Sequence, residues 1–78
     1  MSYNGWKNRQ TWNVSLWINN DEPLYRLACE YVRQAKRVSY DGFVRYAGLG
    51  GERTPDNICY SGARLDRAAL TDMLKELI

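Results

Sequence analysis

Histidine is absent from this 78-residue sequence. The side chain that most readily moves protons near pH 7 is therefore missing, together with the commonest nitrogen ligand for metals. Ser39 and Ser61 have no histidine to activate them, so an ordinary nucleophile of the Ser–His–Asp type is excluded. The carboxylates that lie in or near expected loops, with no nucleophile beside them, are Asp41, Glu52, Asp56 and Asp66. We therefore predict a protein that is not an enzyme and that uses neither a metal nor a cofactor.

Cysteine is scarce, and long apolar runs are lacking. Cys29 and Cys59 stand alone in the sequence, without the spacing of a zinc site or a thioredoxin-like motif. We interpret both thiols as reduced, because a small buried thiol is ordinary within a helical pattern such as that around Cys29. No apolar run approaches the roughly 18 residues of a membrane span. The N-terminus also lacks the apolar region of a secretory signal, so we expect a cytoplasmic protein with no membrane partner.

A large excess of either charge is also missing. The net charge is +2, from eleven basic and nine acidic side chains. This balance is typical of a soluble surface and falls well short of a dedicated nucleic-acid-binding protein.

Aromatic side chains, in contrast, are plentiful: three Trp, six Tyr and one Phe. A chain this short buries roughly 60–65% of its unfolded surface, so large side chains fill its core economically. We predict one all-α domain over residues 1–78, with three to four helices around an aromatic core. The residues expected at its centre are Trp12, Leu16, Trp17, Leu27, Tyr31, Val32, Phe43, Leu70 and Leu74.

Capping residues and apolar periodicity place the helices. After an irregular arm (1–7), Asn8 is an expected N-cap for a helix that continues to about residue 18. Pro23 suits the first turn of a second helix, whose apolar stripe runs from residue 24 to residue 38. Ser39 is expected to cap a third helix that Gly48 ends, and Asp66 to cap the last helix.

The connection over residues 48–65 is rich in glycine and contains proline. Its "GLGGER" segment (48–53) resembles a phosphate-binding loop, but it follows a helix instead of a strand, which favours simple helix termination. "TPDN" (54–57) predicts a turn. Residues 58–60 could form a short extended segment that pairs with the N-terminal arm.

Three residues near the N-terminus are candidates for binding a protein partner: Tyr3, Trp6 and Asn13. Tyr3 and Trp6 lie outside any amphipathic pattern, so either the arm folds back onto the core or Trp6 anchors a partner. Asn13 is the amide that neither capping nor turn formation explains, and if buried it must form hydrogen bonds. A second copy of the chain is an alternative partner, because a small helical protein can leave apolar surface uncovered.

Nucleic-acid binding is the alternative function. Basic side chains gather near the end of the second helix, in the third helix and at the start of the last one, with tyrosines 40, 46 and 60 between them. Such a surface can follow a phosphate backbone and stack bases. The candidate residues are Arg33, Lys36, Arg37, Arg45, Arg64 and Arg67.

The stretch "YNGWKNRQTWNVSLWINND" (3–21) holds all three tryptophans and five asparagines. It resembles the opening of small phage and bacterial proteins of unknown function, as found in phages of marine cyanobacteria, with the pattern Y-N-G-W-x-N-x-x-T-W-N-V-x-L-W-x-x-N-D. "YDGF" (40–43) and "GERTPD" (51–56) are similar to the same group. The resemblance carries no known activity. It implies a short, phage-encoded accessory protein that acts by binding a host or viral component. We therefore expect a non-enzymatic protein that binds an unidentified protein partner and modulates a host process.

Overall fold

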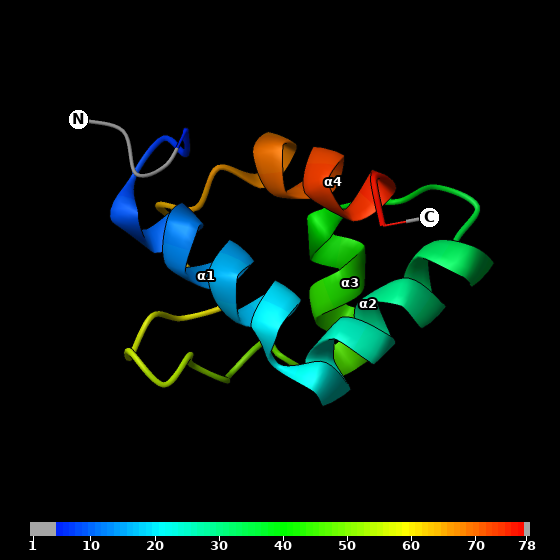
Figure 1. Cartoon of the computed structure of the whole chain (residues 1–78), viewed down its shortest axis with the longest axis horizontal. Coiled ribbons are helices and arrows are strands. Elements are labelled where there is room, and N and C mark those ends of the chain that lie inside the picture. The colour runs from blue at the N-terminus through cyan, green and yellow to red at the C-terminus, as the bar shows by residue number, and fades with distance from the viewer. Residues whose placement is uncertain (1–4, 78) are drawn as a thin grey trace.

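The computed structural model describes residues 5–77, and within this range the chain forms four helices and no strand. The helices are α1 (Arg9–Asn20), α2 (Glu22–Gln34), α3 (Tyr40–Ala47) and α4 (Arg67–Lys75) (Figure 1). This architecture confirms the predicted small all-α domain. None of these helices is long and apolar enough to cross a membrane.

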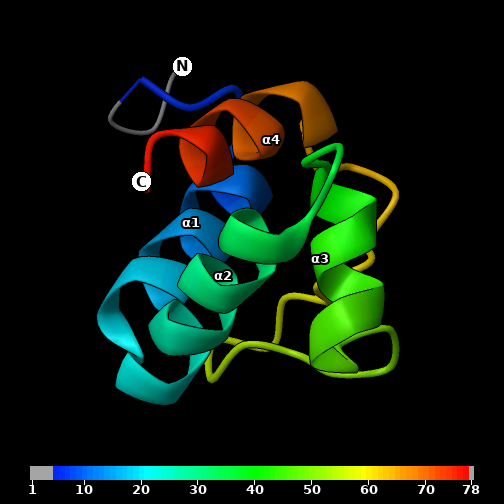
Figure 2. The ribbon, with the colours of Figure 1, turned by 90° about the vertical axis from the view of Figure 1, so that its right-hand side faces the viewer.

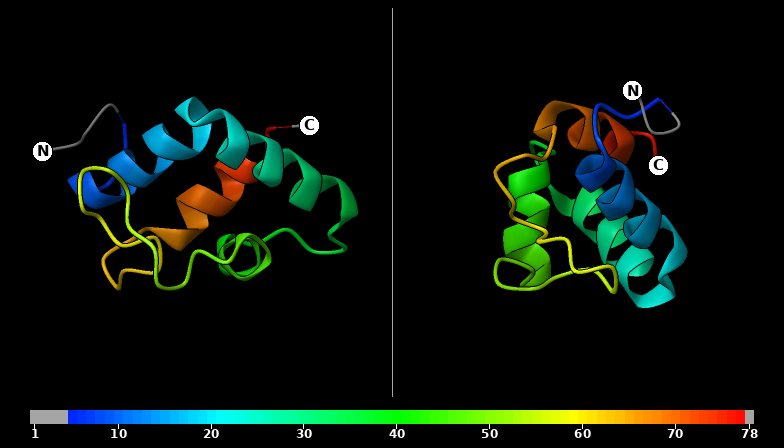
Figure 3. Two further views of the ribbon diagram at one scale, coloured as in Figure 1. Left: turned by 90° about the horizontal axis from the view of Figure 1, so that it is seen from below. Right: turned by 90° about the vertical axis from the view of Figure 1, so that its left-hand side faces the viewer.

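Helices α2 and α4 each contact the other three helices and so hold the fold together. Figure 2 shows α3 standing beside α2 and α4. Seen from below, α3 points along the line of sight while the other helices run across the view (Figure 3). The connection from α3 to α4 passes along α1 before it reaches α4 (Figures 1 and 3). It therefore lies against a helix that is distant from it in the sequence.

The predicted helix ends are confirmed by their hydrogen bonds. The side chain of Asn8 accepts from the Thr11 N–H at 2.8 Å, at the start of α1. Ser39 and Asp66 cap α3 and α4 in the same way, at 3.0 Å and 3.1 Å. Gly48 ends α3 with φ of +70°, a left-handed conformation that glycine adopts without steric cost.

The prediction that tryptophans form the centre of the core is wrong. Val14 and Ile18 are fully buried, whereas Trp12, Leu16 and Trp17 are half-buried at the edge. Apolar residues cover most of α1, so its sequence did not decide which face turns inward. The face that does includes Thr11, which donates to Asn8 Oδ1 and accepts from the Asp66 N–H.

The rest of the core is mixed. The predicted residues Tyr31, Phe43, Leu70 and Leu74 are buried, as expected, while Leu27 and Val32 are only half-buried. The buried residues that the sequence did not place at the centre include Leu24, Ala28, Tyr40, Val44, Tyr60 and Leu65.

Helix α2 is shorter than its apolar stripe predicts, because it ends at Gln34 and Ala35 is extended. The Tyr31 hydroxyl accepts from the Ser39 N–H at 3.1 Å and contacts the Arg37 carbonyl at 3.4 Å. The Arg37 carbonyl and the Ser39 N–H lie in the connection to α3, and the Tyr31 hydroxyl gives both of them a hydrogen-bond partner. Ala35 and Val38 still pack against the core from this connection, which is why the stripe continued past the helix.

Residues 58–60 pair within their own loop and not with the described part of the N-terminal arm. Cys59 forms an isolated antiparallel bridge with Arg53. The Thr54 N–H donates to the Ile58 carbonyl at 2.8 Å, and the Tyr60 N–H donates to the Glu52 carbonyl at 3.1 Å. These bonds close the "TPDN" turn, in which Asn57 has a φ of +69°.

Replacing Gly42 by alanine should destabilise the protein, although alanine favours helices by about 1 kcal/mol over glycine. An added Cβ would collide with the Tyr31 hydroxyl and lie 2.9 Å from Ser39 Oγ. Relieving this overlap should cost about 1–3 kcal/mol. Urea unfolding followed by circular dichroism measures the difference. Gly50→Ala is the matched control, because its Cβ meets nothing within 4 Å. A more stable Gly42→Ala protein would contradict the close contact.

Candidate partner-binding site

Trp6 lies beside α4 at the edge of the core. Gly5 precedes it with φ of +91°, a conformation that glycine adopts without steric cost. The Trp6 side chain is half-buried and packs against the core cluster. Together with α4 it borders a groove of about 370 Å³, lined by Gly5, Trp6, Ala69, Asp72, Met73 and Glu76. Trp6 thus packs onto the domain, with part of its indole left accessible. Tyr3 lies outside the described residues.

Two acidic side chains form the rim of this groove. Asp72 and Glu76 are spaced i, i+4 and are both exposed. Like charges at this spacing repel each other, and negative charge near the C-terminal end of a helix is unfavourable. Within residues 5–77 no ion pair joins either carboxylate to a basic side chain. Two carboxylates without a direct ion pair thus lie together at this groove, on a chain whose net charge is +2.

This arrangement is suited to a cation. An indole ring attracts an ammonium or guanidinium group to its face, and carboxylates accept charge-assisted hydrogen bonds from the same groups. Met73 adds a flexible, polarisable wall that adapts to different side-chain shapes. The groove thus combines an aromatic ring, two carboxylates and an apolar wall.

Asn13 is not available to a partner, which corrects its selection as a binding residue. Its side chain is 1% exposed. Its Oδ1 accepts from the Thr54 hydroxyl at 2.7 Å, and its Nδ2 donates to Asp56 Oδ2 at 2.7 Å. The Trp17 indole N–H donates to the same Asp56 oxygen at 3.0 Å. Asn13 therefore fastens the 48–65 connection to α1, and its role is structural.

The bonds to Asp56 also have an electrostatic effect. The hydrogen bond from Asn13, followed by that from Trp17, holds the pKa of the Asp56 carboxyl below its usual value. Each donor stabilises the ionised form, so the interaction is strongest when Asp56 is negatively charged.

The six basic candidates do not form one surface. Arg67 is half-buried, pairs with Asp41 at 2.9 Å and donates to the Gly62 and Ser61 carbonyls. The segment that contains Arg64 lies near the start of α1, at the end of the molecule away from the end of α2 (Figures 1 and 3). The remaining four are exposed on α2, α3 and the connection between them: Arg33, Lys36, Arg37 and Arg45. Two of the three tyrosines expected among them, Tyr40 and Tyr60, are buried.

Comparison with known protein families matches residues 1–78 to a family of unknown function, DUF7249. The chain belongs to DUF7249. No curated protein and no solved structure matches the chain. The description of DUF7249 names no activity, so a functional proposal for this member depends on its own residues.

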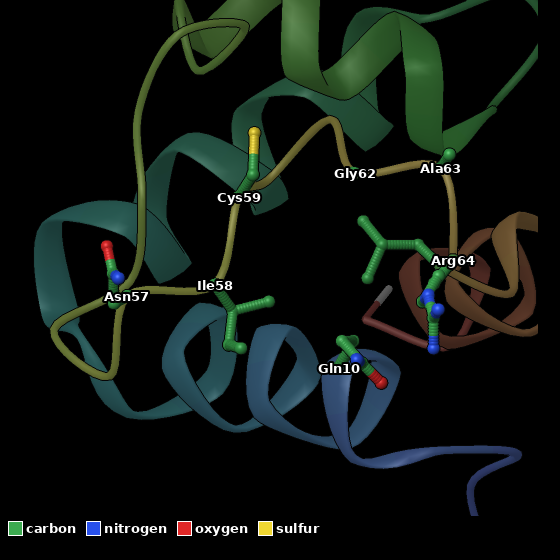
Figure 4. A pocket seen from close by; sticks show the side chains of 8 residues that line it. Gln10, Asn57, Ile58, Cys59, Gly62, Ala63 and Arg64 are labelled. Atoms are coloured by element: carbon green, nitrogen blue, oxygen red, sulfur yellow. The ribbon is translucent and has the colours of Figure 1, made fainter.

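This DUF7249 chain has a second, smaller hollow of about 170 Å³ between the start of α1 and the 57–65 segment (Figure 4). Ile58, Gln10 and Arg64 face it, whereas the Cys59 thiol points away from them. Hydrogen bonds with Ser61, helped by the charge of Arg53, lower the pKa of the Cys59 thiol. The sequence does not reveal this hollow, because its residues come from two segments that share no motif.

Proposed function

We propose that this protein is a non-enzymatic, phage-type accessory protein that binds a protein of its bacterial host and modulates a host process in the cytoplasm. The Trp6–α4 groove carries this proposal. It offers an aromatic anchor of the kind that dominates protein interfaces. The resemblance of residues 3–21 to small phage proteins supports the accessory role, and the two free cysteines are consistent with a reducing compartment.

The partner should present a basic side chain to this groove. A lysine or arginine over the Trp6 ring gains about 0.5–2 kcal/mol from the cation–π interaction, depending on how completely water is excluded. The same cation would offset the repulsion between Asp72 and Glu76. A partner segment rich in lysine or arginine therefore fits this surface better than an acidic or purely apolar one.

Nucleic-acid binding is the second candidate. What favours it is the group of exposed basic side chains at the end of α2 and on α3, next to the exposed ring of Tyr46. Basic and aromatic groups together bind single strands without sequence preference. The acidic groove would take no part in this function.

Reversing the two rim charges should abolish partner binding. Affinity capture from host lysate, read by quantitative mass spectrometry, would compare wild type with Asp72→Lys/Glu76→Lys. Each close charge pair across an interface contributes about 1.5 kcal/mol or more, about tenfold in affinity, so a true partner should be lost almost completely. Lysine near a helix C-terminus is favourable, and the variant should therefore remain folded.

The matched control is Glu52→Lys, which reverses an exposed acid in the 48–65 connection, away from the groove. A host protein retained by wild type and by this control, but not by the groove variant, supports the proposal. Capture that is insensitive to the groove charges contradicts it. If short DNA or RNA strands raise fluorescence anisotropy at micromolar protein and low salt, nucleic-acid binding takes its place.

A further inference from the structure

The outward face of α2 carries an exposed aromatic surface that the Trp6 groove does not include. A hollow of about 370 Å³ on this face is lined by Tyr25, Arg26, Cys29, Glu30 and Arg33. Tyr25 and Tyr46 are the exposed large hydrophobic side chains of the described residues, at 38% and 39%. The Tyr46 hydroxyl donates to Glu30 Oε1 at 3.1 Å, so both rings belong to one surface. Among residues 5–77, no other segment covers the outer side of α2 (Figures 1 and 3).

The charges on this face follow an order along the helix. Glu22 lies in the first turn and Arg33 in the last turn. Arg26 and Glu30 lie between them, so positive and negative charges alternate and the face is nearly neutral as a whole. A parallel copy of α2 would place like charges opposite each other. An antiparallel copy brings the acidic start of one helix to the basic end of the other and opposes the two helix dipoles.

We infer that this face binds a second copy of the chain, with the two α2 helices antiparallel around a two-fold axis near Cys29. In a two-fold symmetric interface every contact occurs twice. If one residue of the first copy touches another residue of the second copy, the same two residues also touch with the copies exchanged. Tyr25 and Arg33 lie equally far from Cys29 on either side, four positions away. The symmetry therefore brings the Tyr25 ring of each copy to the Arg33 guanidinium of the other, a cation–π pair.

The hollow and the thiol both fit this arrangement. Tyr25 projects from the face, and the hollow beside Cys29 and Arg33 receives the same ring from the second copy. Cysteine is small, so it allows the helix axes to approach to about 8–10 Å where they cross. Tyrosine and arginine are also the residues that most often dominate interfaces. The Trp6–α4 groove lies on other elements, so this dimer would present two such grooves and does not depend on the function proposed for them.

The position of Cys29 supplies a direct test. In a Cys59→Ser background, diamide removes two protons and two electrons from a pair of Cys29 thiols and joins them as a disulfide. At tens of micromolar protein, this dimer should form at least about tenfold faster than one joined through Cys59 in Cys29→Ser, because only Cys29 thiols are held within bonding distance. Sedimentation velocity of reduced wild type should show a dimer at the same concentration.

A charge exchange tests the antiparallel orientation. Glu22 lies one turn before Tyr25 on α2, so Arg33 of the second copy also comes near Glu22. Arg33→Glu and Glu22→Arg should each remain monomeric and cross-link slowly, because each brings like charges near each other twice in its own dimer. Mixing the two variants should restore rapid cross-linking, since every such contact in the mixed dimer then pairs opposite charges. Misfolding of either variant cannot produce this rescue. A strictly monomeric wild type, equal cross-linking rates of the two cysteines, or no rescue on mixing would each overturn the inference.

Discussion

Replacing Tyr40 by alanine should lower the free energy of unfolding by about 3–5 kcal/mol, the usual cost of deleting a buried aromatic ring. Tyr40 is the largest of the fully buried side chains. It sits where three parts of the chain meet: its ring contacts Phe43 of α3, its N–H donates to Thr71 of α4, and its hydroxyl donates to the Tyr60 carbonyl. Total stabilities are about 5–15 kcal/mol, so this loss is large. Urea unfolding measures it.

Tyr40→Phe removes the hydroxyl and keeps the ring, so it measures the contribution of the hydrogen bond apart from that of ring packing. It should cost about 1–2 kcal/mol, because the Tyr60 carbonyl loses its donor. Burial also raises the pKa of the Tyr40 phenol above its usual value. The unfolded phenol ionises above about pH 10 while the folded one stays protonated, so wild-type stability should fall as the pH rises past this point. Tyr40→Phe should weaken this decline. Equal stability of the alanine and phenylalanine variants would contradict the packing role of the ring.

The parts of the fold that could be predicted from sequence are those decided by neighbouring residues. An N-cap such as Asn8 or Ser39 acts on amides within its own first turn, and Gly48 ends α3 through its own backbone angle. These features need no knowledge of the rest of the molecule. The all-α class followed from them and from the strong apolar stripe of α2.

The inward face of α1 could not be predicted in the same way. Trp12 and Trp17 outrank Val14 and Thr11 in apolar area, so transfer energies alone favoured the tryptophans for the centre. The structure buries the smaller side chains, and on the same face Thr11 accepts from the Asp66 N–H, which ties the start of α4 to α1. This constraint involves residues 55 positions apart, and only the folded structure reveals it.

The candidate site likewise contains residues that could be predicted from the sequence and residues that could not. Trp6 was identified from sequence because it lies outside the helical patterns. Its acidic neighbours were not, since Asp72 and Glu76 look like ordinary exposed positions at the end of α4 until Trp6 is placed beside them. Asn13 was predicted only to need hydrogen bonds, and its partners lie 41 and 43 positions away.

Asn13→Asp should be severely destabilising at neutral pH, although the two side chains have almost the same shape. The new carboxylate can still accept from Thr54 but can no longer donate to Asp56. It instead places a second negative charge at the position from which Asn13 Nδ2 now donates at 2.7 Å. An uncompensated charge at a nearly fully buried position should lower the free energy of unfolding by about 3–5 kcal/mol.

The pH dependence identifies this cause. In wild type, the lowered pKa of Asp56 means that its bonds stabilise the fold above about pH 4, the usual aspartate value, and lose that effect as the pH falls through the folded pKa. In Asn13→Asp, two carboxyls share one site, so one of them binds a proton at a raised apparent pKa. That proton restores a donor, and the variant should therefore gain stability between pH 7 and pH 5 while wild type does not. Urea midpoints at these two pH values, with Asn13→Ala as the uncharged control, measure the difference. If the urea midpoint of Asn13→Asp is the same at pH 7 and pH 5, the carboxyl groups at positions 13 and 56 do not interact, and the proposed cause is wrong.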